Sequence, residues 1–140
     1  MQEYKRLVGI DVGTKRIGIA QTDLLRTIAS PVGTFSHEEV IPAIKNIASS
    51  ASIEAFIVGW PLTTKGEEGK ATNRVNEFIN RLKKQFPNVS IHKVDERYTS
   101  VEAKNVMVQA GISKKRRQQK ERVDRIAAAL ILQRYMESNY

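Results

Sequence analysis

The chain has 140 residues, 41% of them hydrophobic and 27% charged, which is the composition of a globular domain and excludes a disordered segment. Its 23 lysines and arginines outnumber its 15 aspartates and glutamates, and the net charge of +8 favours polyanionic partners: nucleic acid, a membrane surface or the ribosome. The absence of cysteine excludes disulfides and cysteine-ligated zinc. No apolar run approaches the ~20 residues of a membrane span, so we expect a single cytoplasmic domain over residues 1–140 with no membrane partner.

The first part of the chain is predicted to be rich in strands. Residues 7–12 and 16–22 read as two strands joined by a tight turn over Gly13–Lys15, which makes a hairpin. A third extended stretch runs from about 27 to 35, where Pro31 indicates an edge position or a bulge. Ser36 and Glu39 then have the spacing of a capping box, which predicts a helix ending near Ser50, although Pro42 leaves its start open.

The remainder of the chain alternates strands and helices, with strands at 55–58 and 89–94 and helices at 71–86, 99–111 and from 123 onward. The loop 59–69 is either a substrate-contacting lid or an ordinary connection. Ala127, Ala128 and Ile131 lie one or two helical turns beyond Asp124, so this acid is expected to border an apolar helix face. Three early strands followed by alternating helices and strands predict a mixed sheet with helices packed on it.

Three carboxylate sites, far apart in the sequence, occupy positions suited to an active site. Asp11 directly follows the apolar run 7–10 of the first strand, Asp95 and Glu96 directly follow the strand 89–94, and Asp124 lies near the start of the last helix. An acid at the end of a buried strand is costly to desolvate unless a cation meets it. If the sites converge, the expected ligand is a divalent metal with oxygen ligands, Mg²⁺ or Mn²⁺.

Each carboxylate also has an ordinary structural explanation. Asp11 fits an Asp-x-Gly hairpin turn, and Asp124 fits the first turn of a helix, where the dipole favours an acid. Asp95 and Glu96 could both cap the following helix. Successive strand residues face opposite sides, so only one of this pair is expected to face a metal, and we favour Glu96 because its side chain reaches farther.

Basic residues lie close to these acids in the sequence and are predicted to contact phosphates. A run before Asp124 supplies six of them, with a solvated connector as the alternative: Lys114, Lys115, Arg116, Arg117, Lys120 and Arg122. Thr14 and Lys15 of the hairpin turn can reach a phosphate, and Arg97 could pair with a phosphate or with Asp95. Such contacts position a nucleic acid strand without reading its sequence.

The segment from Gly9 to Ala20, GIDVGTKRIGIA, resembles two groups of the ribonuclease H-like superfamily. One is the sugar-kinase and actin-like ATPases, which need two such domains and therefore far more than 140 residues. The other is the YqgF family, also called RuvX, which is related to the Holliday-junction resolvase RuvC. Its pattern continues, in order and spacing, in VGWPL (58–62), DERYTS (95–100) and VDRIAAALIL (123–132), with Trp60 where Leu or Phe is expected.

This resemblance implies an α/β fold of the ribonuclease H-like type, with a mixed five-stranded sheet of three antiparallel strands and then parallel strands, flanked by helices. It also implies a metal-dependent nuclease in which Asp11, Glu96 and Asp124 hold the metal, with Asp95 as the alternative to Glu96. The implied substrate is the 5′ end of precursor 16S ribosomal RNA, or branched DNA such as a Holliday junction. A nucleic-acid-binding module without catalysis is the alternative from another class. The chain would act as a monomer or, as a junction resolvase requires, as a homodimer.

Overall fold

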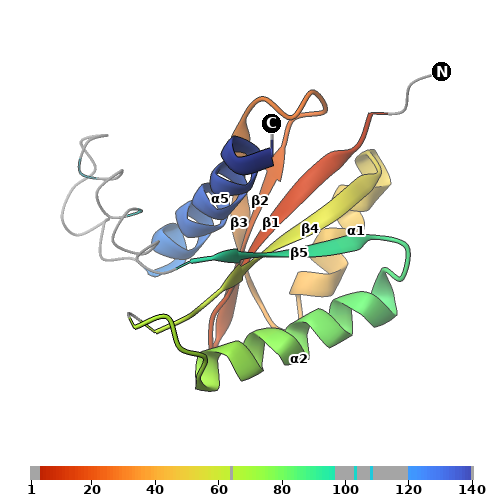
Figure 1. Cartoon of the computed structure of the whole chain (residues 1–140). Coiled ribbons are helices and arrows are strands. Elements are labelled where there is room, and N and C mark those ends of the chain that lie inside the picture. Colours follow the sequence, from red (N-terminus) through yellow and green to blue (C-terminus); the bar gives the residue numbers. More distant parts are fainter. Residues whose placement is uncertain (1–3, 64, 97–102, 104–107, 109–119, 140) are drawn as a thin grey trace.

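The computed structural model describes residues 4–63, 65–96, 103, 108 and 120–139, and for residues 120–123 and 139 it describes the backbone alone. These residues contain a five-stranded sheet in the order β3-β2-β1-β4-β5 (Figure 1). The antiparallel half consists of β1 (Arg6–Val12), β2 (Arg16–Thr22) and β3 (Ala29–Ser36). On the other side of β1, β4 (Ile53–Trp60) and β5 (Ser90–Asp95) add in parallel. The predicted mixed sheet is therefore confirmed.

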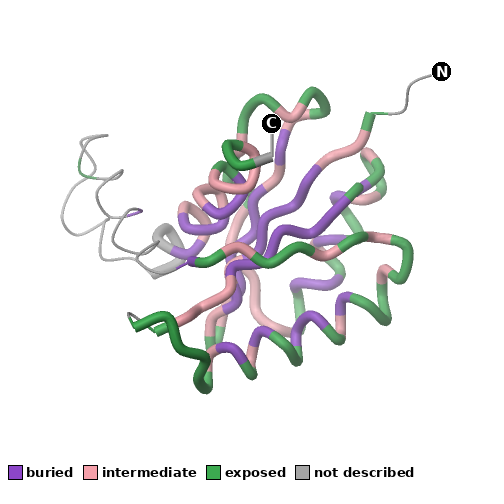
Figure 2. Tube along the Cα trace, viewed as in Figure 1, coloured by how far each residue is buried: buried purple, intermediate pink, exposed green. Residues whose placement is uncertain are grey.

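Helices cover both faces of this sheet. The helices α1 (Val40–Ser50) and α2 (Lys70–Gln85) lie on one face, and α5 (Lys120–Asn139) lies across β1, β2 and β3 on the other (Figure 1). Each face of the sheet buries its own apolar cluster. The inner strands are accordingly buried along most of their length (Figure 2). Strand residues alternate between the two clusters: Val8 and Ile10 of β1 face α1 and α2, whereas Leu7 faces α5.

Two of the strands carry glycines that allow α5 to approach the sheet closely. A Cβ placed on Gly9 would lie 2.6 Å from the backbone oxygen of Ala128, and one placed on Gly18 would lie 2.2 Å from the backbone oxygen of Asp124. Any larger side chain at either position would overlap the helix backbone. The glycines therefore fix how near α5 lies to β1 and β2.

The edge strand β3 has the irregularity that its proline predicts. Ile19 pairs with Gly33 but Ala20 pairs with Pro31, so Val32 is an extra residue in β3, a bulge at the edge of the sheet.

The helix after β3 begins later than its capping pattern indicates. The backbone N–H of Glu39 donates to the Ser36 hydroxyl at 3.2 Å, and the hydroxyl donates to the Glu39 carboxylate at 2.8 Å. These bonds close a turn, and α1 itself starts at Val40. Pro42 lies within its first turn, where a missing N–H costs no intrahelical hydrogen bond.

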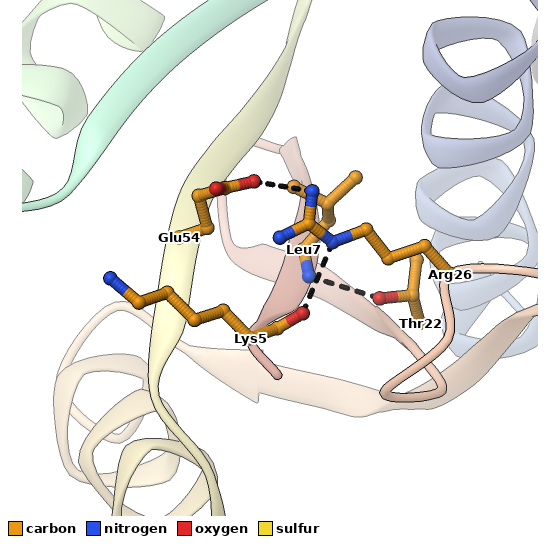
Figure 3. A network of polar contacts seen from close by, with 5 residues as sticks. All are labelled: Lys5, Leu7, Thr22, Arg26 and Glu54. Carbon is orange, nitrogen blue, oxygen red and sulfur yellow. Dashed lines mark hydrogen bonds and ion pairs between the residues drawn. The ribbon is translucent and has the colours of Figure 1, made fainter. Parts of the chain in front are cut away.

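A polar network ties the loop after β2 to the starts of β1 and β4 (Figure 3). Arg26 donates from Nε to the carbonyl of Lys5 at 3.2 Å and pairs with the Glu54 carboxylate at 2.5 Å. In the same region, the buried Thr22 hydroxyl accepts from the backbone N–H of Leu7 at 2.9 Å. These bonds link the strands at the end of the sheet that is opposite Asp11 and Glu96.

The predicted helix over 99–111 lies mostly outside the described residues, of which Ala103 and Val108 are helical. Ala103 is buried against Ile126 and Leu130 of α5. No described helix combines the length and apolar character needed to cross a membrane.

Candidate active site

Asp11 lies on the α5 side of the central strand, next to the end of β1. It is half-buried, and it pairs in register with Gly18 of β2. Because strand residues alternate, Asp11 shares its face with Leu7 and Gly9, both of which pack against α5. The first carboxylate therefore projects into the space between the sheet and α5.

Glu96 reaches the same space from the other side of β1. Its backbone N–H donates to the carbonyl of Trp60 at 3.1 Å, which continues the β4–β5 ladder by one residue. Its carboxyl group lies against Gly59, where an added Cβ would be 2.6 Å from both Cδ and Oε2. The Glu96 carboxyl also shares a hydrogen bond with Asp11. Two acids separated by 85 positions in the sequence thus meet directly.

The electrostatics of this pair follow from its burial. The pKa of Glu96 is raised from 4.5 to about 10, mainly by desolvation, then by the charge of Asp11 and the hydrogen bond with it, and last by the charge of Asp95. The positive charge of Arg134 acts in the opposite direction. Two carboxylates in contact within a poorly solvated site cannot both ionise at low cost, so they share a proton.

Asp124 approaches Asp11 from above the sheet. It is buried, with 8% of its surface exposed, in the same α5 stripe as Ala127, Ala128 and Ile131. Its carbonyl oxygen lies over Gly18, the register partner of Asp11. The expectation that Asp124 borders an apolar face is confirmed. Ile126 and Leu130 of the same helix are only half-buried, and they pack against Ala103.

Asp95 lies on the opposite face from Glu96. It pairs with Trp60, whose ring packs against the α1–α2 cluster and carries the ammonium of Lys93 at 3.9 Å from its centroid. The Asp95 side chain is exposed, and its backbone carbonyl accepts a hydrogen bond from Arg134 of α5 at 2.9 Å. Of the two adjacent acids, the structure brings Glu96 to Asp11 and turns Asp95 away.

The donor chemistry of the site fits a hard divalent cation. Asp11 and Glu96 present carboxylate oxygens on rigid strands, which is the ligand type that Mg²⁺ and Mn²⁺ prefer. Among the described residues, no three Asp, Glu, His or Cys side chains are grouped around one point as they would be around a bound ion. The structure thus brings two of the predicted ligands into contact and places the backbone of the third beside them.

The predicted phosphate-contacting residues fall into two groups. Thr14 and Lys15 are described, and both are exposed in the turn between β1 and β2. The carbonyl of Gly13 in this turn accepts a hydrogen bond from Nε2–H of His37 at 3.0 Å. The rest lie outside what the structure describes, either entirely or, for the last two, in their side chains: Arg97, Lys114, Lys115, Arg116, Arg117, Lys120 and Arg122.

The loop after β4 is shorter than predicted, because Gly59 and Trp60 belong to the strand. Its described residues form a turn in which Thr63 N–H donates to Glu67 O and Gly66 N–H donates to Thr63 O, both at 2.8 Å. They are mostly exposed (Figure 2). A substrate-contacting lid and an ordinary connection are both compatible with these contacts, so the lid stays a prediction.

Sequence reasoning missed the residues that support the acids. Gly18 and Gly59 leave room for Asp124 and Glu96, and Arg134 fixes the backbone next to Glu96. The glycines stood within the quoted motifs, but a glycine in a strand does not reveal which element lies over it. Arg134 lies outside the quoted motifs, so no local signal marked it.

Two solved structures with a similar fold are of the Thermus thermophilus protein RuvC. "T. thermophilus RuvC in complex with Holliday junction substrate" superimposes with a TM-score of 0.57 at 16% identity, covering 97% of each chain. A second Thermus thermophilus RuvC structure gives a TM-score of 0.53 at 11% identity, covering 96% of each chain. The mixed sheet, with helices on both faces and two acids meeting on the α5 side, therefore belongs to the class of α/β folds that these RuvC structures share.

The sequence comparisons identify the family. A family model described as "RuvX: Holliday junction resolvase" matches residues 5–138. A relative from Chlorobaculum tepidum is 40% identical over 136 residues, covering 97% of this chain and 96% of the relative, and one from Salinibacter ruber is 42% identical over 131 residues, covering 94% and 92%. Both bear the name "Putative pre-16S rRNA nuclease". The chain belongs to the RuvX family.

Proposed function

We propose that this protein is a divalent-metal-dependent nuclease that processes the 5′ end of precursor 16S ribosomal RNA. The observation that carries the proposal is the meeting of Asp11 with Glu96 beneath the backbone of Asp124. A structural role explains such a cluster poorly, because paired buried carboxylates without a cation are costly to keep. The substrate is taken from the names of the relatives, which match this chain over nearly its whole length.

In the proposed mechanism, Asp11 and Glu96 would hold the cation through carboxylate oxygens, and Asp124 would provide a further oxygen from α5. The cation, Mg²⁺ or Mn²⁺, would supply an activated water and charge stabilisation for phosphodiester hydrolysis. The chain supplies the positioning. Gly59, which lacks a side chain, leaves room for the Glu96 carboxyl against β4. Arg134 donates a hydrogen bond to the carbonyl of Asp95, the residue before Glu96, and so fixes the backbone there. Thr14 and Lys15, exposed at the adjacent turn, contact the phosphate backbone of the substrate.

The test uses a labelled RNA fragment that spans the mature 5′ end of 16S ribosomal RNA, with Mg²⁺ or with EDTA. Wild type should cleave with Mg²⁺ only, and Asp11→Asn, Glu96→Gln and Asp124→Asn should each reduce the cleavage rate by more than ~100-fold. Asp95→Asn is the matched control, because it neutralises the adjacent acid that faces away. Its rate should stay within several-fold of wild type. Binding of the RNA by wild type without any cleavage would leave only the binding-module alternative.

Cleavage of branched DNA is the second candidate, favoured by the description of the matching family as a Holliday junction resolvase. A synthetic four-way junction in the same assay separates the two. A resolvase has to cut two strands symmetrically and therefore needs a homodimer, whereas RNA processing is compatible with a monomer. The oligomeric state, measured by light scattering with and without junction, is thus part of the test. Ribosomal RNA as substrate would place the protein in the cytoplasm, in contact with the maturing ribosome.

A further inference from the structure

A small basic cavity lies on the face of the sheet opposite the paired acids. It has a volume of about 90 Å³ and is lined by His37, Arg74, Glu77, Phe78 and Arg81. Arg74 and Arg81 lie seven residues apart on α2, so their side chains emerge on the same helix face. Two guanidinium groups against one carboxylate give the cavity a positive charge, which suits an anion.

The two arginines differ in how they are held. Arg81 donates from a terminal nitrogen to the carbonyl of His37 at 2.8 Å, and its guanidinium lies 5.6 Å from the centre of the Phe78 ring. Arg74 is half-buried, and within the described residues it makes no hydrogen bond or ion pair, nor does Glu77. Arg81 is thus built into the fold, whereas Arg74 offers a guanidinium whose donors are available to a ligand.

The cavity is connected to the candidate active site through one side chain. His37, which receives Arg81 on its carbonyl, donates from its ring to the carbonyl of Gly13. Gly13 lies two residues beyond Asp11, at the start of the turn that exposes Thr14 and Lys15. A path therefore runs from the acids on the α5 face, over the turn at the end of the sheet, to the cavity on the α2 face.

We propose that Arg74 and Arg81 form a second phosphate-binding site, which holds the backbone of the nucleic acid beyond the scissile phosphate. The strand would leave the acids, pass over the turn at Thr14 and Lys15, and place one backbone phosphate at the cavity. A guanidinium binds phosphate through paired N–H donors, and a backbone contact of this kind raises affinity without sequence preference. The site rests on the proposed nuclease function for its ligand, and it adds a substrate contact on the face away from the chemistry.

The experiment measures RNA binding without cleavage, by fluorescence anisotropy in EDTA over a range of salt concentrations. The probes are the 5′-end precursor fragment and a short oligonucleotide confined to the cleavage position. Arg74→Ala should weaken binding of the long fragment several-fold and make its log Kd against log salt slope shallower by about 0.7, the value of one single-strand phosphate contact. Binding of the short probe should not change. Arg74→Lys, which retains the charge, should keep most of the slope.

Lys84→Ala is the matched control, because it removes the same charge from an exposed position near the other end of α2. Equal slopes for Arg74→Ala and Lys84→Ala would overturn the second site. A second result would also overturn it: millimolar inorganic phosphate raises the Tm of wild type but not that of Arg74→Ala, while Arg74→Ala leaves the salt slope of RNA binding unchanged. The cavity would then bind free phosphate and not the RNA backbone. If wild type cleaves RNA and Arg74→Ala does not change the salt slope of RNA binding, only the second site is rejected. If Arg74→Ala makes the slope shallower but wild type never cleaves, the second site is kept and the proposed nuclease function is rejected.

Discussion

Gly59 lies directly against the carboxyl group of Glu96. A methyl carbon at Gly59 would be 2.6 Å from Cδ and Oε2 of Glu96 and 2.7 Å from Cδ1 of Ile131. We expect Gly59→Ala to displace the Glu96 carboxyl from Asp11 and reduce metal-dependent cleavage at least ~10-fold, with a loss of ~1–3 kcal/mol in the free energy of unfolding. Cleavage rates and urea unfolding measure the two effects.

Gly69→Ala is the control for that variant, because a Cβ at Gly69 meets no atom within 4 Å. Its cleavage rate should equal that of wild type, and its stability should change by less than ~1 kcal/mol, since glycine here precedes α2 as the N-cap. Full activity of Gly59→Ala would show that the position of Glu96 against β4 is irrelevant to the reaction.

The second prediction concerns the contact of α5 with β2. A Cβ on Gly18 would lie 2.2 Å from the backbone oxygen of Asp124, and backbone cannot rotate away as a side chain can. Gly18→Ala should therefore destabilise the fold by ~3 kcal/mol, at the upper end of overpacking effects. Gly33→Ala, whose Cβ meets only the ring end of Phe35 at 3.2 Å, should cost much less. Thermal unfolding of the two variants makes the comparison, and similar Tm values would contradict the close approach.

The third prediction is a pH dependence of the metal-free protein. Because the pKa of Glu96 is raised from 4.5 to about 10, the folded chain binds more protons than the unfolded chain between these values. The stability from this group is therefore complete below pH 4.5 and is lost as pH rises toward 10, by at most about 1.4 kcal/mol for each pH unit. In EDTA, the free energy of unfolding of wild type should fall from pH 6 to pH 9 relative to that of Glu96→Gln. Parallel pH profiles of the two proteins would contradict a raised pKa.

The fourth prediction contrasts two polar interactions at the other end of the sheet (Figure 3). The Arg26–Glu54 pair is partly exposed, so Glu54→Ala should cost less than ~1 kcal/mol. Thr22→Val removes the hydroxyl that accepts the buried Leu7 N–H, and an unsatisfied buried donor costs ~1–3 kcal/mol. Chemical denaturation should therefore rank Thr22→Val as the more damaging change. The reverse order would show that the ion pair carries this corner of the fold.

Much of the secondary structure follows from local pattern. The strand β2 was predicted residue for residue, because apolar alternation between a tight turn and polar residues leaves little freedom. The strand β4 was predicted too short, since Gly59 and Trp60 interrupt the apolar run although they continue the ladder opposite Val94 and Asp95. Pairing with a neighbouring strand, which the local sequence does not contain, decided where β4 ends.

Local pattern could not decide which of the two adjacent acids, Asp95 or Glu96, faces Asp11. Adjacent acids at 95 and 96 point to opposite faces of the sheet, and the sequence offered only side-chain length to choose between them. The structure places Glu96 on the α5 face with Asp11 and leaves Asp95 exposed, because β5 pairs with β4 in a register that sets Asp95 opposite Trp60. The catalytic role of each acid remains a prediction for the cleavage assay.

By itself, the sequence determined the class of sheet, its antiparallel start, the family, and three acids at element ends as candidate ligands. These properties are local or linear: alternation, turn chemistry and motif order are all written along the chain. The tertiary structure alone decided that Asp11 and Glu96 are in contact and that the backbone of Asp124 lies against Gly18. It also decided that a basic cavity lies between His37 and α2. Such contacts depend on strand register and on the distance between α5 and the sheet, which are set by packing between residues remote in sequence.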